Sequence, residues 1–380
     1  MFGNRIPLFR VAGIQISADL SWFLVVVLFT WSLADSYFPR EEVLPGLAPA
    51  EYWLLGFAAA LLLFASIVLH ELGHALTAQR LGVPIRGITL FIFGGVAEMT
   101  EEPPTAKAEF QVAVAGPVVS VVLGFAFLAA GFGGAAAAWP AVATELLQFL
   151  GAMNLYLVVF NMVPAFPLDG GRVLRSVLWQ WKGSLRWATR VTSTIGSFLG
   201  TALIALGVLW AIGLSDLMGG MWLALIGLFV RSAARMSYQQ LLLRRALEGE
   251  PVSRFMHPEP VTVPRSISVA ELVQDYVYRH HFKAFPVVEG DRLVGCVTTR
   301  DVRRLPREEW ERQTVGTVAE PCSEENTVPP DLDAMEALSR MSRSGRSRLL
   351  VAQGDRLLGI LSLKDLLKFF SLRMELEEAA

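Results

Sequence analysis

Charged residues are scarce in this chain of 380 residues: only 18% are Asp, Glu, Lys or Arg, whereas 53% are hydrophobic. This balance argues against a large soluble protein and favours a polytopic membrane protein. The formal net charge is only −2, and no basic stripe with interleaved aromatic residues is present, so the sequence predicts no nucleic-acid partner. Cysteine is also rare. Cys296 and Cys322 are too few for a disulfide framework, and we expect both to be free thiols.

The apolar residues are concentrated in the first part of the chain. Residues 1–245 contain the long apolar runs, whereas residues 250–380 resemble an ordinary soluble sequence. Residues 1–18 read as a short amphipathic lead-in, and no small-residue cleavage site follows the first apolar run, so we expect that run to be retained as a span. The runs predict about six transmembrane helices. Their expected ranges are 20–33, 52–80, 110–130, 142–163, 191–212 and 221–241.

Residues 84–98 are too short and too rich in β-branched and aromatic residues to be another span. The pair Gly94–Gly95 follows such a run, which is typical of a hairpin turn. The predicted fold is therefore a polytopic α-helical membrane protein with a small membrane-associated β-hairpin, followed by a soluble α/β part.

The lysine and arginine residues fall unevenly between the predicted loops. If the N-terminus is inside the cell, the outer loops contain Arg40 alone. The inner loops contain the remaining basic residues, namely Arg5, Arg10, Arg80, Arg86, Lys107 and the basic stretch 172–190. This bias predicts a multi-pass protein of the cell membrane, with the N-terminus and the soluble part in the cytoplasm.

The second predicted span carries polar residues that are expensive inside a membrane. His70-Glu71-Leu72-Gly73-His74 continues this span without a break in its apolar character. Two histidines four residues apart lie on one helix face within reach of one Zn²⁺, and the glutamate beside the first can act as general base. Arg80 follows ten residues after His70, so the site lies roughly 15 Å below the inner surface and opens towards the cytoplasm. The competing interpretation is a chance match in which the histidines bond helix carbonyls or Glu71.

A catalytic zinc ion usually has three protein ligands and one open position. The predicted spans contain no further histidine, so the third ligand should be a carboxylate. Glu145 starts the fourth span at the outer face, and we expect Glu98 and Glu109 to lie in water near the inner surface. Asp169 follows the inner end of the fourth span, in a turn with two prolines and two glycines, and is the preferred candidate. Its alternative role is to cap the next helix.

Two amides lie seven residues apart on one face of the fourth span, Asn154 and Asn161. Amides are costly in an apolar helix, and hydrogen bonding between helices is one explanation for them. For Asn161, which lies beside the turn, the other explanation is that it holds substrate or an oxyanion.

Together these motifs resemble the two signatures of the site-2 protease family, the intramembrane zinc metalloproteases. They are His70-Glu71-Leu72-Gly73-His74 and Asn161-Met162-Val163-Pro164-Ala165-Phe166-Pro167-Leu168-Asp169-Gly170-Gly171. The resemblance covers residues 1 to about 245 and implies that one Zn²⁺ is bound by His70, His74 and Asp169. It also implies that Glu71 is the general base and that Asn161 matches the family's asparagine. The hairpin with Gly94 and Gly95 is the counterpart of the family's hairpin near the active site, where it meets the substrate.

The chemistry implied is hydrolysis of a peptide bond in or near the transmembrane segment of a single-span membrane protein. A helical substrate must unwind locally before its carbonyl is exposed, and an exposed strand edge can receive the extended segment by β-addition. We hypothesise that the strand around residues 88–93 receives it.

The soluble part contains an internal repeat, in which residues 289–301 align with residues 353–365 at a spacing of 64 residues. Each copy predicts two strands joined by a Gly-Asp turn, then a helix that starts at a Thr/Ser-x-x-Asp box. The repeat resembles a tandem pair of CBS modules, a family in which Gly-x-x-Thr/Ser-x-x-Asp holds the ribose of an adenine nucleotide. The resemblance implies that ATP, ADP or AMP is bound by Thr298, Asp301, Ser362 and Asp365. Helix capping alone is the alternative role of these residues.

The sequence thus predicts a zinc protease domain (1–245), a linker (246–252), two CBS modules (253–310 and 311–375) and a tail (376–380). Because the linker is short, we hypothesise that nucleotide binding or homodimerisation of the CBS pair changes substrate access. One rival interpretation is a CBS-regulated metal-cation transporter or channel. It gives Glu71 no role, and the predicted spans show no sign of the two-fold repeat that many transporters contain. Another is an inactive scaffold for membrane partners, against which the intact metal motif argues.

Overall fold

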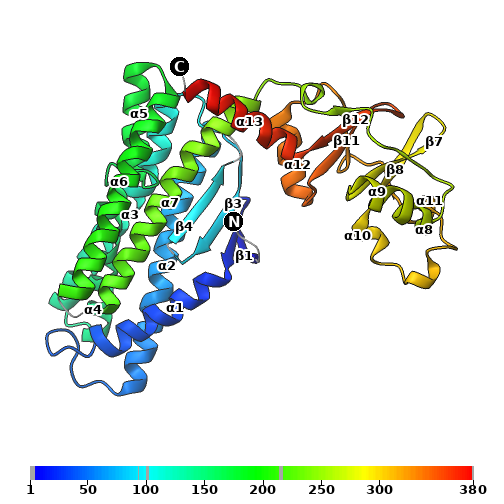
Figure 1. Cartoon of the computed structure of the whole chain (residues 1–380). Helices are drawn as coiled ribbons and strands as arrows, with labels where there is room; N and C mark the ends of the chain where they lie inside the picture. The colour runs from blue at the N-terminus through cyan, green and yellow to red at the C-terminus, as the bar shows by residue number, and fades with distance from the viewer. Residues whose placement is uncertain (1–4, 93, 100–101, 214–216, 379–380) are drawn as a thin grey trace. The chain divides into compact units, whose positions relative to one another are not determined.

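The computed structural model describes residues 5–92, 94–99, 102–213 and 217–378. The chain divides into two compact units, Met1–Gln239 and Gln240–Ala380, which we call the membrane unit and the C-terminal unit. The division falls inside one helix, α7 (Leu217–Leu247). Figure 1 shows the helices of the membrane unit and the mixed α/β structure of the C-terminal unit.

Long apolar helices make up most of the membrane unit. Among the described residues, five stretches are long and apolar enough to cross a membrane: Leu20–Tyr37, Pro49–Arg80, Ala106–Ala136, Ala141–Asn161 and Leu185–Gly213. They are α1 (Leu20–Ser32) with the π-helical turn η1 (Leu33–Tyr37), α2 (Pro49–Arg80), α3 (Ala106–Ala136), α4 (Ala141–Asn161) and α6 (Leu185–Gly213). The first five predicted spans fall on these helices, and the sixth lies within α7.

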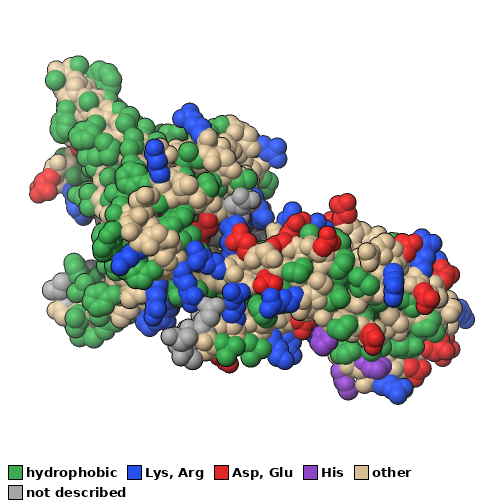
Figure 2. Space-filling model, turned by 90° about the horizontal axis from the view of Figure 1, so that it is seen from above, with side chains coloured by type: hydrophobic (Ala, Val, Ile, Leu, Met, Phe, Trp, Pro, Cys, Tyr) green, Lys and Arg blue, Asp and Glu red, His purple; other side chains and the backbone are tan. Residues whose placement is uncertain are grey.

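Between α4 and α6 lies the short amphipathic helix α5 (Asp169–Lys182). Large apolar side chains cover much of the surface of the membrane unit, as contact with lipid requires, whereas charges of both signs cover the C-terminal unit (Figure 2).

Local signals set the ends of the helices that carry the site. At the start of α2, the Glu51 carboxylate accepts a hydrogen bond from the backbone N–H of Ala48 at 2.7 Å. The Thr105 hydroxyl accepts one from the N–H of Ala108 at 3.1 Å and so begins α3. Gly183, with φ +66°, ends α5 in the left-handed conformation that glycine adopts at little cost.

A four-stranded sheet packs against α2. Its strands, in spatial order, are β1 (Arg5–Val11), β2 (Ile14–Asp19), β3 (Ile85–Phe91) and β4 (Gly94–Met99). β2 and β3 run parallel, and the other neighbours run antiparallel. The predicted hairpin is therefore present as β3 and β4, but as half of a larger sheet. Residues 5–19, expected to form only an amphipathic lead-in, supply the other two strands because Ile14, Ile16 and Ala18 alternate into the core.

Two details of the predicted hairpin are corrected by the structure. Gly94 and Gly95 are the first residues of β4 and not the turn. Phe93 lies outside the described residues. The strand expected to receive the substrate, residues 88–93, falls on β3, which is an interior strand with β2 on one side and β4 on the other. An interior strand has no free edge, so β3 cannot accept an additional strand.

The C-terminal unit is built on one eight-stranded sheet with the order β10-β11-β12-β8-β7-β6, in which β5 pairs with β12 and β9 with β8. Its strands are β5 (His257–Pro258), β6 (Val263–Pro264), β7 (Ala284–Glu289), β8 (Arg292–Thr298), β9 (Glu320–Pro321), β10 (Thr327–Val328), β11 (Arg348–Gln353) and β12 (Arg356–Ser362). Its helical segments are η2 (Val252–Arg254), α8 (Val269–Glu271), η3 (Leu272–Val277), α9 (Tyr278–His280), α10 (Thr299–Val302), η4 (Arg307–Glu309), α11 (Val315–Val318), α12 (Ala334–Ser344) and α13 (Leu363–Glu378).

The internal repeat appears as two similar halves that exchange their first strands. The hairpin of β7 and β8 in the first half corresponds to that of β11 and β12 in the second. β5, which precedes the first hairpin, pairs with β12 of the second half, and β9, which precedes the second hairpin, pairs with β8 of the first half. Each half therefore completes its sheet with a strand from the other.

Residues 246–252, predicted as a linker, lie against the second half of the repeat. Leu247 and Val252 are fully buried in a core cluster with Val328, Leu349 and Leu361. The backbone N–H of Val252 also donates to the carbonyl of Leu332 at 2.8 Å. This segment is thus part of the folded C-terminal unit.

Candidate active site

Two helices bring the three predicted metal ligands together. His70 and His74 project from one face of α2 and are only 2% and 3% exposed. Asp169 is the first residue of α5. Its Oδ2 lies 3.1 Å from Nε2 of His70 and 3.2 Å from Nε2 of His74, and the two Nε2 atoms lie 3.2 Å apart. The three atoms form a nearly equilateral triangle.

This triangle has the dimensions that a zinc ion imposes. Zinc bonds of about 2.0–2.1 Å in tetrahedral geometry place neighbouring ligand atoms about 3.3 Å apart. Within the described part of the chain, His70, His74 and Asp169 are also the group of His, Cys, Asp or Glu residues whose ligand atoms lie close enough together to hold one metal ion. These residues therefore fit Zn²⁺ with one coordination position left open.

Gly116 of α3 keeps the space beside the triangle open. A Cβ atom at this position would lie 2.7 Å from Nε2 of His70 and would also collide with Nε2 of His74. Any side chain here would therefore displace the metal-binding nitrogens. No sequence motif marked Gly116 as part of the site.

α3 also orients both histidine rings. Nδ1 of His74 donates to the carbonyl oxygen of Val112 at 2.7 Å, because a carbonyl can only accept. Nδ1 of His70 lies 2.9 Å from the hydroxyl of Ser120. Such contacts fix the ring tautomer and leave Nε2 free to bind metal. A spacing of four residues places Ser120 and Gly116 on one face of α3, but nothing in the sequence marks that face as the one that meets the histidines.

The predicted base, Glu71, lies beneath the start of β4. A Cβ atom at Gly95 would come within 2.7 Å of Cγ of Glu71, so a larger residue would push this carboxylate away. Gly94 has a φ of +130°, which favours glycine for a different reason. The two glycines thus bring the edge of the sheet next to the carboxylate.

The two asparagines of α4 have different environments. Asn154 is fully buried, and its Nδ2 donates to the hydroxyl of Ser66 on α2 and to the carbonyl of Leu150. This is the interhelical hydrogen bonding considered from the sequence. Asn161 is half-buried at the last position of α4, directly before the turn that leads to Asp169.

The carboxylates rejected as third ligand remain outside the triad. The Glu98 carboxylate accepts from Thr89 at 3.1 Å and pairs with Arg5. Glu145 is half-buried near the start of α4. Glu109, expected in water, is instead fully buried and ion-paired with Arg175. The expectation failed because Arg175, on the next helix but one, neutralises a carboxylate that lies inside the fold.

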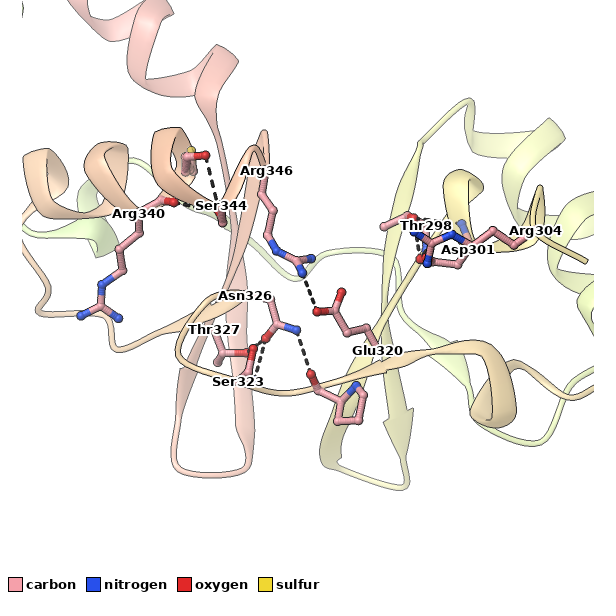
Figure 3. Close-up of polar contacts among 12 residues, drawn as sticks. Thr298, Asp301, Arg304, Glu320, Ser323, Asn326, Thr327, Arg340, Ser344 and Arg346 are labelled. Carbon is pink, nitrogen blue, oxygen red and sulfur yellow. Dashed lines mark hydrogen bonds and ion pairs between the residues drawn. The ribbon is translucent and has the colours of Figure 1, made fainter. Parts of the chain in front are cut away.

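The predicted nucleotide residues of the C-terminal unit form two helix caps. Asp301 accepts from the backbone N–H of Thr298 at 3.0 Å and from its hydroxyl at 2.5 Å (Figure 3). Ser362 and Asp365 make the same pair of contacts, with a backbone distance of 3.1 Å. Helix capping, the alternative given by the sequence, therefore describes the contacts that these four residues make.

Comparisons with known proteins agree with both halves of the chain. Residues 58–135 and 130–206 match Peptidase family M50, and residues 252–308 and 316–372 match the CBS domain. Rip3 of Mycobacterium tuberculosis is 36% identical over 364 residues, which cover 95% of this chain and 92% of that protein. Zinc metalloprotease MJ0392 of Methanocaldococcus jannaschii is 32% identical over 377 residues, 98% of either chain.

Among solved structures, the site-2 protease from Methanocaldococcus jannaschii is 31% identical, with a TM-score of 0.43 over 61% of this chain and 94% of that one. Identity above 30% to relatives over nearly their whole length decides the family, and the zinc-sized triangle between α2 and α5 agrees with it. The chain belongs to peptidase family M50, the site-2 protease family, and is a multi-pass membrane zinc metalloprotease with a C-terminal pair of CBS domains.

Proposed function

We propose that the protein hydrolyses a peptide bond in or near the transmembrane segment of a single-span membrane protein, with one Zn²⁺ held by His70, His74 and Asp169. The observation that carries this proposal is the triangle of ligand atoms with 3.1–3.2 Å edges, formed by two histidines of the apolar helix α2 and the first residue of α5. Zinc, when bound, supplies the Lewis acidity that lowers the pKa of water and polarises a carbonyl. Glu71 takes the proton from the attacking water and passes it to the leaving amine. Family membership and the task that this gives Glu71 favour a protease over a cation channel or a scaffold.

The first test compares the wild type with Glu71→Gln and with Glu42→Gln, an exposed loop control. Zinc content and cleavage of a co-expressed single-span substrate are both measured. We expect about one zinc per chain in all three proteins and cleavage by the wild type and the control only. A Glu71→Gln variant that still cuts would remove Glu71 as the base, and a wild type without zinc would remove the metal site.

We propose that the substrate segment adds to β4, because β4 is one of the two outer strands of the sheet in the described residues and Gly95 places it beside Glu71. Asn161, at the inner end of α4, is proposed to hold the same segment or its oxyanion. Proline replaces a backbone N–H, so Val96→Pro and Ala97→Pro remove adjacent N–H groups that point in opposite directions from β4. The variant that loses the outward N–H should keep its zinc and cut less. Wild-type cleavage rates in both variants would contradict the proposal that the substrate adds to β4 as a strand.

We propose that the N-terminus, the mouth of the site and the CBS pair face the cytoplasm, on the basis of the positive-inside rule. The native thiol of Cys322 is exposed and offers a direct test. A membrane-impermeant maleimide should label it in permeabilised cells and not in intact cells. Labelling in intact cells would reverse the orientation.

We further propose that the CBS pair binds ATP, ADP or AMP through Thr298, Asp301, Ser362 and Asp365, and that the nucleotide regulates proteolysis. Arg346 supports this proposal, because it follows α12 of the second module and pairs with Glu320, on the strand next to β8, at 2.5 Å (Figure 3). A nucleotide phosphate would compete with Glu320 for the same guanidinium.

Nucleotide binding by the purified full-length protein provides the test. We expect ATP or AMP to bind the wild type, to bind more weakly to Asp301→Asn or Asp365→Asn, and to change the cleavage rate. An unchanged rate with bound nucleotide would remove regulation only, and the absence of binding would remove both claims. The molecular mass of the protein particle in solution, measured with and without nucleotide, tests the homodimerisation expected of the CBS pair. The mass of a single chain under both conditions would contradict it.

A further inference from the structure

A buried ion pair joins the helix of the aspartate ligand to α3. Arg175 of α5 is 4% exposed and Glu109 of α3 is fully buried. Nε of Arg175 donates to Oε1 of Glu109 at 2.6 Å, and Nη2 contacts the same oxygen. A second carboxylate, Oε2 of Glu102, lies 3.6 Å from Nη2. Charges that are removed from water are costly, so an ion pair this deeply buried in the fold calls for an explanation.

Arg175 also contacts the turn that carries Asp169. Its guanidinium lies 5.3 Å from the centre of the Phe166 ring, in a cation–π contact. The backbone directly after Asp169 packs closely against the preceding turn, because a Cβ atom at Gly170 or Gly171 would collide with the backbone of residues 162–166. The arginine therefore connects α3 with the segment from which Asp169 projects.

The position of Glu109 on α3 links this pair to the histidines. Glu109, Val112, Gly116 and Ser120 recur every three or four residues and so follow one face of the helix. Val112 and Ser120 already orient His74 and His70. With the ion pair included, one face of α3 contacts both histidines and the helix that carries Asp169.

A contribution to folding stability does not explain why this ion pair is buried here. A buried ion pair often contributes no more stability than apolar residues of the same volume would. Here Oε2 of Glu109 has no hydrogen-bond partner among the described residues, which adds to the cost. What the planar, two-pronged guanidinium does provide is a fixed geometry between two helices.

We propose that Arg175 and Glu109 are positioning residues that hold α5 at the distance from α3 where Asp169 completes the zinc triad. This inference rests on the proposed zinc site. Neither residue belongs to the proposed ligand triad, so the effect of losing them should appear first as weaker metal binding.

The test measures zinc affinity by competition with a chelator and the absorption spectrum of the Co²⁺-substituted protein, alongside thermal unfolding. The decisive variant is the neutral double change Arg175→Met with Glu109→Gln, which leaves no unpaired buried charge. Arg175→Lys keeps the positive charge but loses the planar guanidinium whose two nitrogens contact Glu109. Arg190→Ala, an exposed arginine on α6, is the control.

We expect the double variant to fold, to bind zinc about 10–100-fold more weakly and to show an altered Co²⁺ spectrum. Arg175→Lys should fall between it and the wild type, and Arg190→Ala should match the wild type. At saturating zinc, kcat should fall while KM for the substrate stays constant.

A folded double variant with wild-type zinc affinity would overturn the proposal. The reversed pair, Glu109→Arg with Arg175→Glu, covers the case in which the double variant does not fold: loss of fold in both would show that the pair is purely structural. The proposed function fails separately, if the wild type itself binds no zinc or if His70→Ala binds as much as the wild type.

Discussion

Gly116→Ala should weaken zinc binding strongly while leaving the fold of the protein intact. The new methyl carbon would lie 2.7 Å from Nε2 of His70. An ordinary contact is about 3.5 Å, so the ring nitrogen must retreat by roughly 0.8 Å, whereas zinc bonds hold to within about 0.2 Å. Loss of an outer hydrogen bond costs about 10–100-fold in metal affinity. Displacement of a ligand should cost at least ~100-fold, which is about 2.7 kcal/mol.

The fold should survive because the atoms in the way are the ends of two side chains, which can rotate. Alanine is also favoured over glycine in a helix by about 1 kcal/mol. Gly133 lies on the same helix with nothing within 4 Å of its added Cβ, so Gly133→Ala is a matched control. Zinc content, chelator competition and thermal unfolding are measured on both. Zinc binding by Gly116→Ala within threefold of the wild type would refute the geometry of the site.

Three further predictions follow from the same structure. Treatment with 1,10-phenanthroline should abolish cleavage and added Zn²⁺ should restore it; activity that survives complete metal removal contradicts the proposed chemistry. Burial raises the pKa of the Cys296 thiol to about 12 from an ordinary value near 9.0, so at pH 8 a maleimide should modify the exposed Cys322 alone. The thiol of Cys296 ionises at a lower pH in the unfolded chain than in the folded one, so the fold loses stability as pH rises from about 9 to 12. Rapid labelling of Cys296 at pH 8 would contradict its burial. Leu247→Ala should destabilise the C-terminal unit by about 2–5 kcal/mol in thermal or denaturant unfolding, whereas Leu376→Ala, 75% exposed, should have little effect.

The parts of the fold that follow from local pattern were predictable. Apolar length located the helices, and the motif around His70 located two ligands, because four-residue spacing on a helix fixes their common face. Asp169 required more, since its place depends on a turn and on a second helix. Its place in the turn after the fourth span made Asp169 the preferred candidate, the family resemblance supported that choice, and the structure brings Asp169 to the histidines.

The contributions of α3 could not be read from the sequence. Glu109, Gly116 and Ser120 matter because of what lies opposite them on α2 and α5, and nothing in their own neighbourhood shows this. The first two strands were missed for the same reason, because β2 finds its partner β3 about 70 residues later. The repeat predicted the hairpins of the CBS pair but not the exchange of β5 and β9.

That exchange determines how the protein can be dissected. A fragment that ends after the first module would lack β9, and one that begins at the second would lack β5, so each would expose an unpaired strand edge. The two modules should therefore unfold in a single transition, and neither should fold correctly without the other. Truncation within this region would produce an aggregation-prone stub, and an experiment that needs the protease without its CBS pair must remove both modules together.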